Sequence, residues 1–217
     1  MENRKSNLKG SIFIIITFLA VQIFGALAVL ALTNFAPSIA ISAMVGVNVL
    51  GVFVALWINN RYNIVYDFER NPSSISQIIK WGLLGMALAY LSQVAIVFIE
   101  ILIFGEPSVS ANTESIMQVV SGEPIFLLLP IFTAPFIEEF VFRKAINGIL
   151  VDKIGWIGGA VISSLLFAFV HFDGMILTYA MMGLVFSYVY YKTNSIWTPI
   201  LAHMGMNLLA TILNLMM

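Results

Sequence analysis

Two adjacent carboxylates, Glu138 and Glu139, lie inside the apolar stretch Pro130 to Arg143, which reads PIFTAPFIEEFVFR. An ionisable side chain at membrane depth is costly unless it is paired or hydrated, so it marks a functional site by default. Residues four apart share one helix face, and Glu139 is therefore expected to form an ion pair with Arg143. Glu138 points about 100° away from that face. It has no such partner, which makes it the candidate proton acceptor.

The two histidines of the chain, His171 and His203, also lie in apolar stretches. His203 shares a helix face with Asn207, and His171 shares one with Phe167, because each pair is four residues apart. At the helical rise per residue, Glu138, both histidines and Asn207 fall about 16 to 24 Å from the cytoplasmic markers Lys153, Gly155 and Lys192. Three helices can therefore bring them to one level of the membrane.

Such a cluster allows hydrolysis by water. A carboxylate with a histidine can deprotonate water, and a second histidine with an amide can donate hydrogen bonds to the oxyanion of a tetrahedral intermediate. The same Glu138, His171 and His203 could instead bind zinc, although the sequence lacks H-E-x-x-H. We favour the version without a cofactor. Serine or threonine nucleophiles such as Ser163, Ser164 or Thr133 are less attractive, since each is as easily a packing residue.

The composition predicts the environment that must hold these residues. Of 217 residues, 60% are hydrophobic and 10% are charged, and the mean hydropathy is +0.99. Soluble domains carry about 25% charged residues. The chain is therefore predicted to be an all-α, polytopic transmembrane bundle that forms one membrane domain over residues 1–217. The absence of basic tracts argues against a nucleic-acid partner, and the absence of cysteine excludes disulfides and thiolate sites.

Hydropathy and turn residues predict about seven membrane-spanning helices. An eighth short helix in the loops 59–79 or 105–122 stays possible. The expected spans are Ser11–Leu32, Ile39–Ile58, Lys80 or Trp81 to Phe104, Ile125–Leu150, Gly155–His171, Met175–Tyr191 and Ile196–Met216.

The charges predict an orientation. With seven spans, every lysine and arginine falls at or towards the side of the N-terminus, whereas the opposite side receives Glu106, Glu114, Glu123 and Asp173. Lysine and arginine flank spans on the cytoplasmic side, so we expect a cytoplasmic N-terminus, in a bacterial plasma membrane. A signal peptide is the alternative for the first apolar run, but its length and the further spans favour a retained helix.

Three patterns carry a family resemblance: E-E-x-x-x-R at Glu138 to Arg143, F-x-x-x-H at Phe167 to His171, and H-x-x-x-N at His203 to Asn207. In this order and spacing they resemble the signature of the CPBP intramembrane proteases. That family includes type II CAAX prenyl endopeptidases and bacterial proteins linked to bacteriocin processing and self-immunity. The resemblance covers about residues 124–209, which would form the catalytic core.

The resemblance implies an intramembrane endopeptidase, of the glutamate or the metallo type, acting on a prenylated, leader or other membrane-associated peptide. Glu138 and His171 would activate the water, His203 and Asn207 would stabilise the oxyanion, and Glu139, Arg143 and Phe167 would support the site. Two other functions stay open: a proton-coupled transporter using the same buried groups, and a non-catalytic immunity or binding protein. The oligomeric state and the substrate are not predicted by the sequence.

Overall fold

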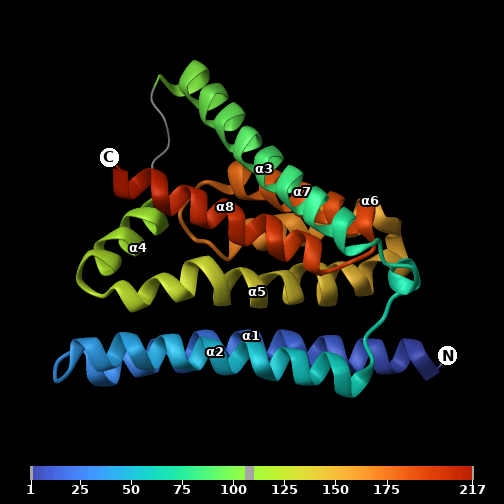
Figure 1. Cartoon of the computed structure of the whole chain (residues 1–217), viewed down its shortest axis with the longest axis horizontal. Helices are drawn as coiled ribbons and strands as arrows, with labels where there is room; N and C mark the ends of the chain where they lie inside the picture. The colour runs from blue at the N-terminus through green and yellow to red at the C-terminus, as the bar shows by residue number, and fades with distance from the viewer. Residues whose placement is uncertain (1, 106–109, 217) are drawn as a thin grey trace.

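The computed structural model describes residues 2–105 and 110–216. All secondary structure in this part of the chain is helical, as the composition predicted, and the helices form one bundle (Figure 1). The α-helices are α1 (Glu2–Leu32), α2 (Pro37–Tyr62), α3 (Ile75–Phe104), α4 (Ala111–Gly122), α5 (Ala134–Glu139), α6 (Gly148–Phe169), α7 (Ile176–Thr193) and α8 (Trp197–Met216). Shorter segments are the 3₁₀ turns η1 (Asp67–Arg70) and η2 (Pro124–Leu127) and the π-helical segments η3 (Leu129–Thr133) and η4 (Phe140–Asn147).

The paired glutamates lie on a long rod that runs from η2 through η3, α5 and η4 into α6. Pro130 and Pro135 have no N–H to donate, so a regular α-helical ladder cannot run through this region. The chain instead widens into π-helical turns before and after α5, a distortion that is frequent at functional sites. Gly155 then adopts φ 74° and ψ 170°, a conformation that glycine tolerates. The rest of α6 turns back there, as the predicted division between the fourth and fifth spans required.

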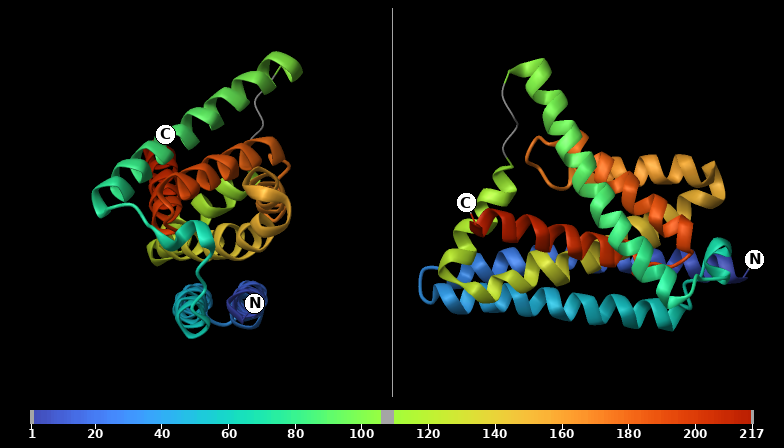
Figure 2. Two further views of the ribbon diagram at one scale, coloured as in Figure 1. Left: turned by 90° about the vertical axis from the view of Figure 1, so that its right-hand side faces the viewer. Right: turned by 45° about the horizontal axis from the view of Figure 1, so that its top comes forward.

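The helices α1 and α2 form a hairpin that lies along the rod (Figures 1 and 2). Ile14 and Phe18 of α1 are buried in one core cluster with Phe140 and Phe142 of the rod. Gly51 of α2 permits the close approach, because a Cβ atom there would overlap a side-chain atom of Val21 and lie 3.0 Å from one of Ile137. The first predicted span is therefore an integral part of the bundle.

The helix α3 crosses α7 and α8 obliquely (Figure 1). Gly82 and Gly85 allow this contact, since a Cβ atom at these positions would come within 3.0 Å of Leu201 and Ala202 of α8. The second half of α3 stands away from the bundle and exposes apolar side chains such as Leu91, Phe98 and Leu102. In a membrane this half faces lipid.

Five stretches of the described residues are long and apolar enough to cross a membrane: Arg4–Leu32, Pro37–Tyr62, Ile75–Phe104, Pro124–Phe169 and Trp197–Met216. The fourth stretch contains two of the predicted spans, divided at Gly155. The sixth predicted span is the helix α7, which is less apolar because it contains four tyrosines and Lys192. The loop 105–122, where an eighth helix was possible, contains α4.

The loops that were predicted on the basic side of the membrane meet at one end of the bundle. Arg4 pairs with Asp152 at 3.4 Å, and the Ser73 N–H donates to the Thr193 carbonyl at 2.9 Å. These contacts bring together the N-terminal turn, the loop after α2, the turn before Gly155 and the α7–α8 turn (Figure 1). The arrangement agrees with the predicted grouping of the basic residues, while the cytoplasmic assignment of this end stays a prediction.

Candidate active site

The expected ion pair between Glu139 and Arg143 is present and completely buried. Arg143 Nη1 lies 3.2 Å from Glu139 Oε1, and both side chains are 0% exposed. Arg143 Nη2 also donates to the Gly183 carbonyl of α7 at 3.1 Å. The guanidinium carbon lies 4.5 Å from the ring centre of Phe167, so an aromatic face covers the cation. The ion pair thereby joins the rod to α6 and α7.

His203 of α8 is fixed by the same glutamate. Its Nδ1 lies 2.8 Å from Glu139 Oε1, and its ring stacks on Phe186 with centroids 4.7 Å apart. An ionised carboxylate only accepts hydrogen bonds, so Nδ1 carries the proton in this pair. The second ring nitrogen, Nε2, is then directed to the neighbouring Glu138.

Glu138 is the partly accessible member of the cluster, with its side chain 17% exposed. Its Oε2 lies 3.8 Å from His203 Nε2, which is too long for a direct hydrogen bond. At that separation one water molecule can contact both atoms. The site therefore has a completely buried side, formed by Glu139 and Arg143, and a side that is partly open at Glu138.

Asn207 lies one helical turn after His203 and donates from Nδ2 to the Pro130 carbonyl at 2.7 Å. The reason is local to the π-helical turn. The Ala134 N–H donates to the Leu129 carbonyl, five residues earlier. With the same spacing, the Pro130 carbonyl would accept from the N–H of residue 135, but that residue is proline and has no N–H. Asn207 satisfies this freed carbonyl within the membrane. The second amide N–H and the amide oxygen of Asn207 are the groups that could form hydrogen bonds with a substrate.

His171 packs on Phe167, whose ring also contacts His203. The helix α6 ends at Phe169, two residues before His171, so the expected fifth span does not extend to this histidine. Its Nδ1 is 2.8 Å from the Phe167 carbonyl, and its ring packs on Phe167 and Tyr179. Among the described residues no hydrogen bond or ion pair joins His171 to Glu138. The structure groups Glu138 with His203, whereas the sequence analysis paired it with His171.

The predicted zinc ligands are not assembled in this conformation. Within residues 2–105 and 110–216, no three His, Asp or Glu side chains lie close enough together to share a metal ion. Glu138 and His203 are neighbours, but His171 is turned to the Phe167 carbonyl. The donor set Glu138, His171 and His203 therefore does not fit a three-ligand zinc site as it stands.

A second buried ion pair, between Lys144 and Glu69, was not predicted from the sequence. Lys144 was placed at the cytoplasmic flank, but its side chain is 6% exposed and its Nζ lies 2.7 Å from Glu69 Oε1 and 2.7 Å from Glu69 Oε2. Tyr190 of α7 donates to the same carboxylate. Because η1 carries Glu69 and η4 carries Lys144, this pair fixes the loop after α2 to the π-helical turn that carries Arg143. A lysine directly after Arg143 in an apolar run was the one signal available.

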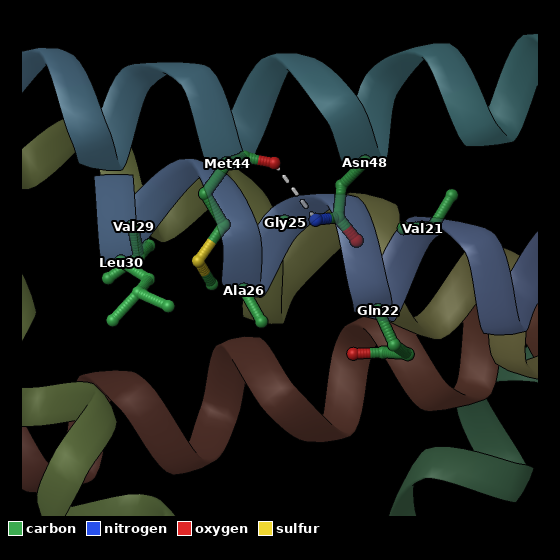
Figure 3. Close-up of a pocket in the computed structure, with 8 residues that line it drawn as sticks. All are labelled: Val21, Gln22, Gly25, Ala26, Val29, Leu30, Met44 and Asn48. Atoms are coloured by element: carbon green, nitrogen blue, oxygen red, sulfur yellow. Dashed lines mark hydrogen bonds between the residues drawn. The ribbon is translucent and has the colours of Figure 1, made fainter. Parts of the chain in front are cut away.

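A cavity of about 380 Å³ lies between α1 and α2, outside this cluster. Figure 3 shows its lining residues Val21, Gln22, Gly25, Ala26, Val29, Leu30, Met44 and Asn48. None of these side chains is ionisable. The Asn48 amide is bound to the Met44 carbonyl of its own helix at 2.9 Å. The cavity therefore provides no titratable groups for the proton relay that a transporter would need.

Comparisons with known proteins agree with the sequence motifs. Residues 120–209 match the model of the family described as type II CAAX prenyl endopeptidase Rce1-like. The chain is 36% identical over 143 residues to a Bacillus subtilis (strain 168) protein named "Putative membrane peptidase YdiL", covering 65% of this chain and 59% of that protein. It is 37% identical over 137 residues to the Staphylococcus aureus (strain USA300) "Membrane-embedded CAAX protease MroQ", covering 60% and 56%.

The chain thus spans less than two thirds of the length of these relatives. No solved structure matches it. The matched segment 120–209 contains all three motifs and every residue of the cluster around Glu139. Residues 120–209 are therefore similar to the Rce1-like type II CAAX prenyl endopeptidase (CPBP) family, whose signature the motifs resemble.

Proposed function

We propose that the chain is an intramembrane endopeptidase that hydrolyses a peptide bond of a membrane-associated peptide. The observation that carries the proposal is the buried constellation of Glu138, Glu139, Arg143 and His203 on two helices, with Glu138 alone partly open. Residues 120–209, which contain these four residues, match the model of a family described as type II CAAX prenyl endopeptidases. A purely structural Glu139–Arg143 ion pair would not need Glu138, a second carboxylate without a lysine or arginine partner, beside His203.

In the proposed reaction a water molecule lies between Glu138 Oε2 and His203 Nε2, which are 3.8 Å apart. Glu138 takes a proton as the water oxygen bonds to the carbonyl carbon of the substrate. When the carbon–nitrogen bond breaks, this proton passes to the leaving nitrogen. A carboxylate base positioned in this way typically contributes about 10² to 10⁴ in rate.

The remaining residues hold or assist this reaction. Glu139 keeps His203 in one orientation through the 2.8 Å contact, and Arg143 balances the charge of Glu139 at 3.2 Å. Asn207 has one amide N–H bound to Pro130 and a second free to donate to the oxyanion. His171 is assigned to water activation by the family resemblance, and Nε2 is the nitrogen with which it would act, since Nδ1 is bound to the Phe167 carbonyl.

The position of the site within the membrane bears on the substrate class and on the orientation of the chain. We infer a substrate that reaches the site from the bilayer, such as a prenylated C-terminal peptide or the leader of a secreted peptide, and a cytoplasmic N-terminus at the end where the basic loops meet. A protein that confers bacteriocin immunity by binding alone would share the fold but would not need the acid at position 138.

The test is cleavage by the purified chain in proteoliposomes. Membrane-anchored peptides of both substrate classes are supplied, and products are identified by mass spectrometry. Glu138→Gln should lower the cleavage rate by at least about 100-fold, whereas Glu114→Gln, a matched change at an exposed acid of α4, should leave it unchanged. Equal rates for Glu138→Gln and the wild type, or no cleavage of any peptide by the wild type, would favour the binding protein instead.

A further inference from the structure

The turn that carries His171 is not held by regular helix. His171 follows the end of α6 at Phe169, and the next residues include Phe172 at φ 51° and Gly174 at φ 82°. A positive φ is unfavourable for a bulky side chain such as phenylalanine, so the chain here cannot continue as an α-helix. The orientation of the imidazole therefore depends on the contacts of the ring itself.

Three contacts fix the His171 ring. Its Nδ1 donates to the Phe167 carbonyl at 2.8 Å, which leaves Nε2 as the free nitrogen because a carbonyl can only accept. The edge of the ring meets Phe167 with centroids 4.6 Å apart. Its face stacks on Tyr179 of α7 at 3.9 Å and an interplanar angle of 22°. Tyr179 thus covers one face of a histidine that the family motif assigns to the site.

Tyr179 is in turn tied by its hydroxyl. The hydroxyl donates to Asp173 Oδ2 at 2.9 Å. The same oxygen accepts from Ser110 Oγ at 2.8 Å, and Asp173 Oδ1 accepts from the Met175 N–H at 3.2 Å. Because Ser110 also caps the start of α4 by accepting from the Thr113 N–H at 3.0 Å, one carboxylate connects α4, the α6–α7 turn and α7.

The α6–α7 turn, which carries Asp173, lies at a recessed position in the bundle. In Figure 1 the α6–α7 turn lies well short of the α1–α2 turn along the long axis, on the side where α4 is found. The turn is therefore recessed from that end of the bundle, and Asp173 attaches the first residue before α4 to it.

We propose that Tyr179 is a positioning residue for His171, and that Asp173, by binding both Tyr179 and Ser110, makes this positioning depend on the docking of α4. The effect on cleavage rests on the proposed function, whereas the effect on the imidazole does not. Asp173 was expected on the side opposite the N-terminus, and Tyr179 is outside the three motifs.

The ring itself can be observed directly because the chain contains only two histidines. In protein labelled with ¹³C and ¹⁵N at histidine, two imidazole signals are expected, and His203→Gln identifies which belongs to His171. Stacking on Tyr179 shifts the His171 ring protons, so Tyr179→Leu should move or broaden that signal and leave His203 in place. Phe186→Leu, which removes the ring stacked on His203 at 4.7 Å, should produce the reverse pattern. An unchanged His171 signal in Tyr179→Leu would overturn the proposal.

The cleavage assay tests the consequence. Displacing a reacting group by about 1 Å can cost up to about 100-fold, and we expect Tyr179→Leu to lower kcat by about 10- to 100-fold with little change in KM. Tyr188→Leu on the same helix is the matched control, because Tyr188 is exposed and packs on Trp81. A Tyr179→Leu rate within twofold of the Tyr188→Leu rate would contradict the positioning role.

The tether is tested by a double variant. Tyr179→Phe and Asp173→Ala each remove one end of the same hydrogen bond, so each should lower kcat and the double variant should be no slower than the slower single variant. Multiplicative losses would show that the two residues act separately and would refute the tether. If the wild type cleaves nothing, the proposed function fails, and the imidazole signals still decide whether Tyr179 positions His171.

Discussion

The buried pair of Glu139 and Arg143 leads to the most quantitative prediction. Arg143→Met keeps a long apolar side chain but leaves the Glu139 carboxylate, which is 0% exposed, with His203 as its one polar side-chain partner among the described residues. Removing one partner of a buried ion pair typically costs about 3 to 5 kcal/mol, because the other charge stays buried. Glu139→Gln should cost a similar amount, since the buried guanidinium then loses the negative charge that lies 3.2 Å away and keeps a neutral amide oxygen, the Gly183 carbonyl and the faces of Phe167 and Phe186.

The double variant Glu139→Gln/Arg143→Met separates the ion pair from simple packing. If the two losses were independent they would total about 6 to 10 kcal/mol, but with both charges absent no uncompensated charge remains. We therefore expect the double variant to be no less stable than either single variant, within about 1 kcal/mol. Reversible unfolding in mixed detergent micelles, followed by fluorescence of the four tryptophans, measures this. Additive losses, or an Arg143→Met cost below about 1 kcal/mol, would refute the reasoning.

Three further predictions address the surroundings of the site. Gly183→Ala should destabilise the protein by about 1 to 3 kcal/mol in the same unfolding assay, because the new Cβ would lie 2.9 Å from Ser164 Cβ and 3.0 Å from Arg143 Nη2. The control Gly46→Ala, where a new Cβ would have no atom within 4 Å, should not destabilise it. Equal effects of the two substitutions would contradict this prediction. Lys144→Met should lower the free energy of unfolding by about 3 to 5 kcal/mol, because the buried Glu69 carboxylate loses its cationic partner. Lys153→Met, at an exposed lysine, should lower it by less than about 0.5 kcal/mol. An equally small effect of Lys144→Met would argue against the buried ion pair. Because Glu138, His171 and His203 do not form a three-ligand set, a zinc chelator should leave peptide cleavage unchanged, and a loss that zinc restores would contradict this geometry.

The features that the sequence predicted correctly are those set by local spacing. Glu139 and Arg143 pair because residues four apart on a helix meet, and the division of the rod at Gly155 follows from a glycine between two apolar runs. The family motifs were recognised because each lies within one short segment, and the family match covers them. Helical content and the membrane setting followed from composition alone.

The features that the sequence analysis did not predict depend on contacts between distant segments. Glu69 and Lys144 are 75 residues apart, so no spacing rule joins them. The family resemblance assigns His171 to water activation with Glu138, but it does not predict that α6 ends at Phe169 or that the imidazole binds the Phe167 carbonyl. The bond from Asn207 to Pro130 arises only because the helix widens into a π turn ahead of Pro135.

The central claim is that Glu138 is the base that activates water, and chemical rescue tests it most directly. Glu138→Ala in proteoliposomes should cleave about 10² to 10⁴ times more slowly than the wild type. Since this side chain is partly exposed, added formate should enter the vacated space and restore part of the rate, whereas the neutral formamide should not. A Glu138→Ala variant that cleaves within a few-fold of the wild type without formate would contradict the account.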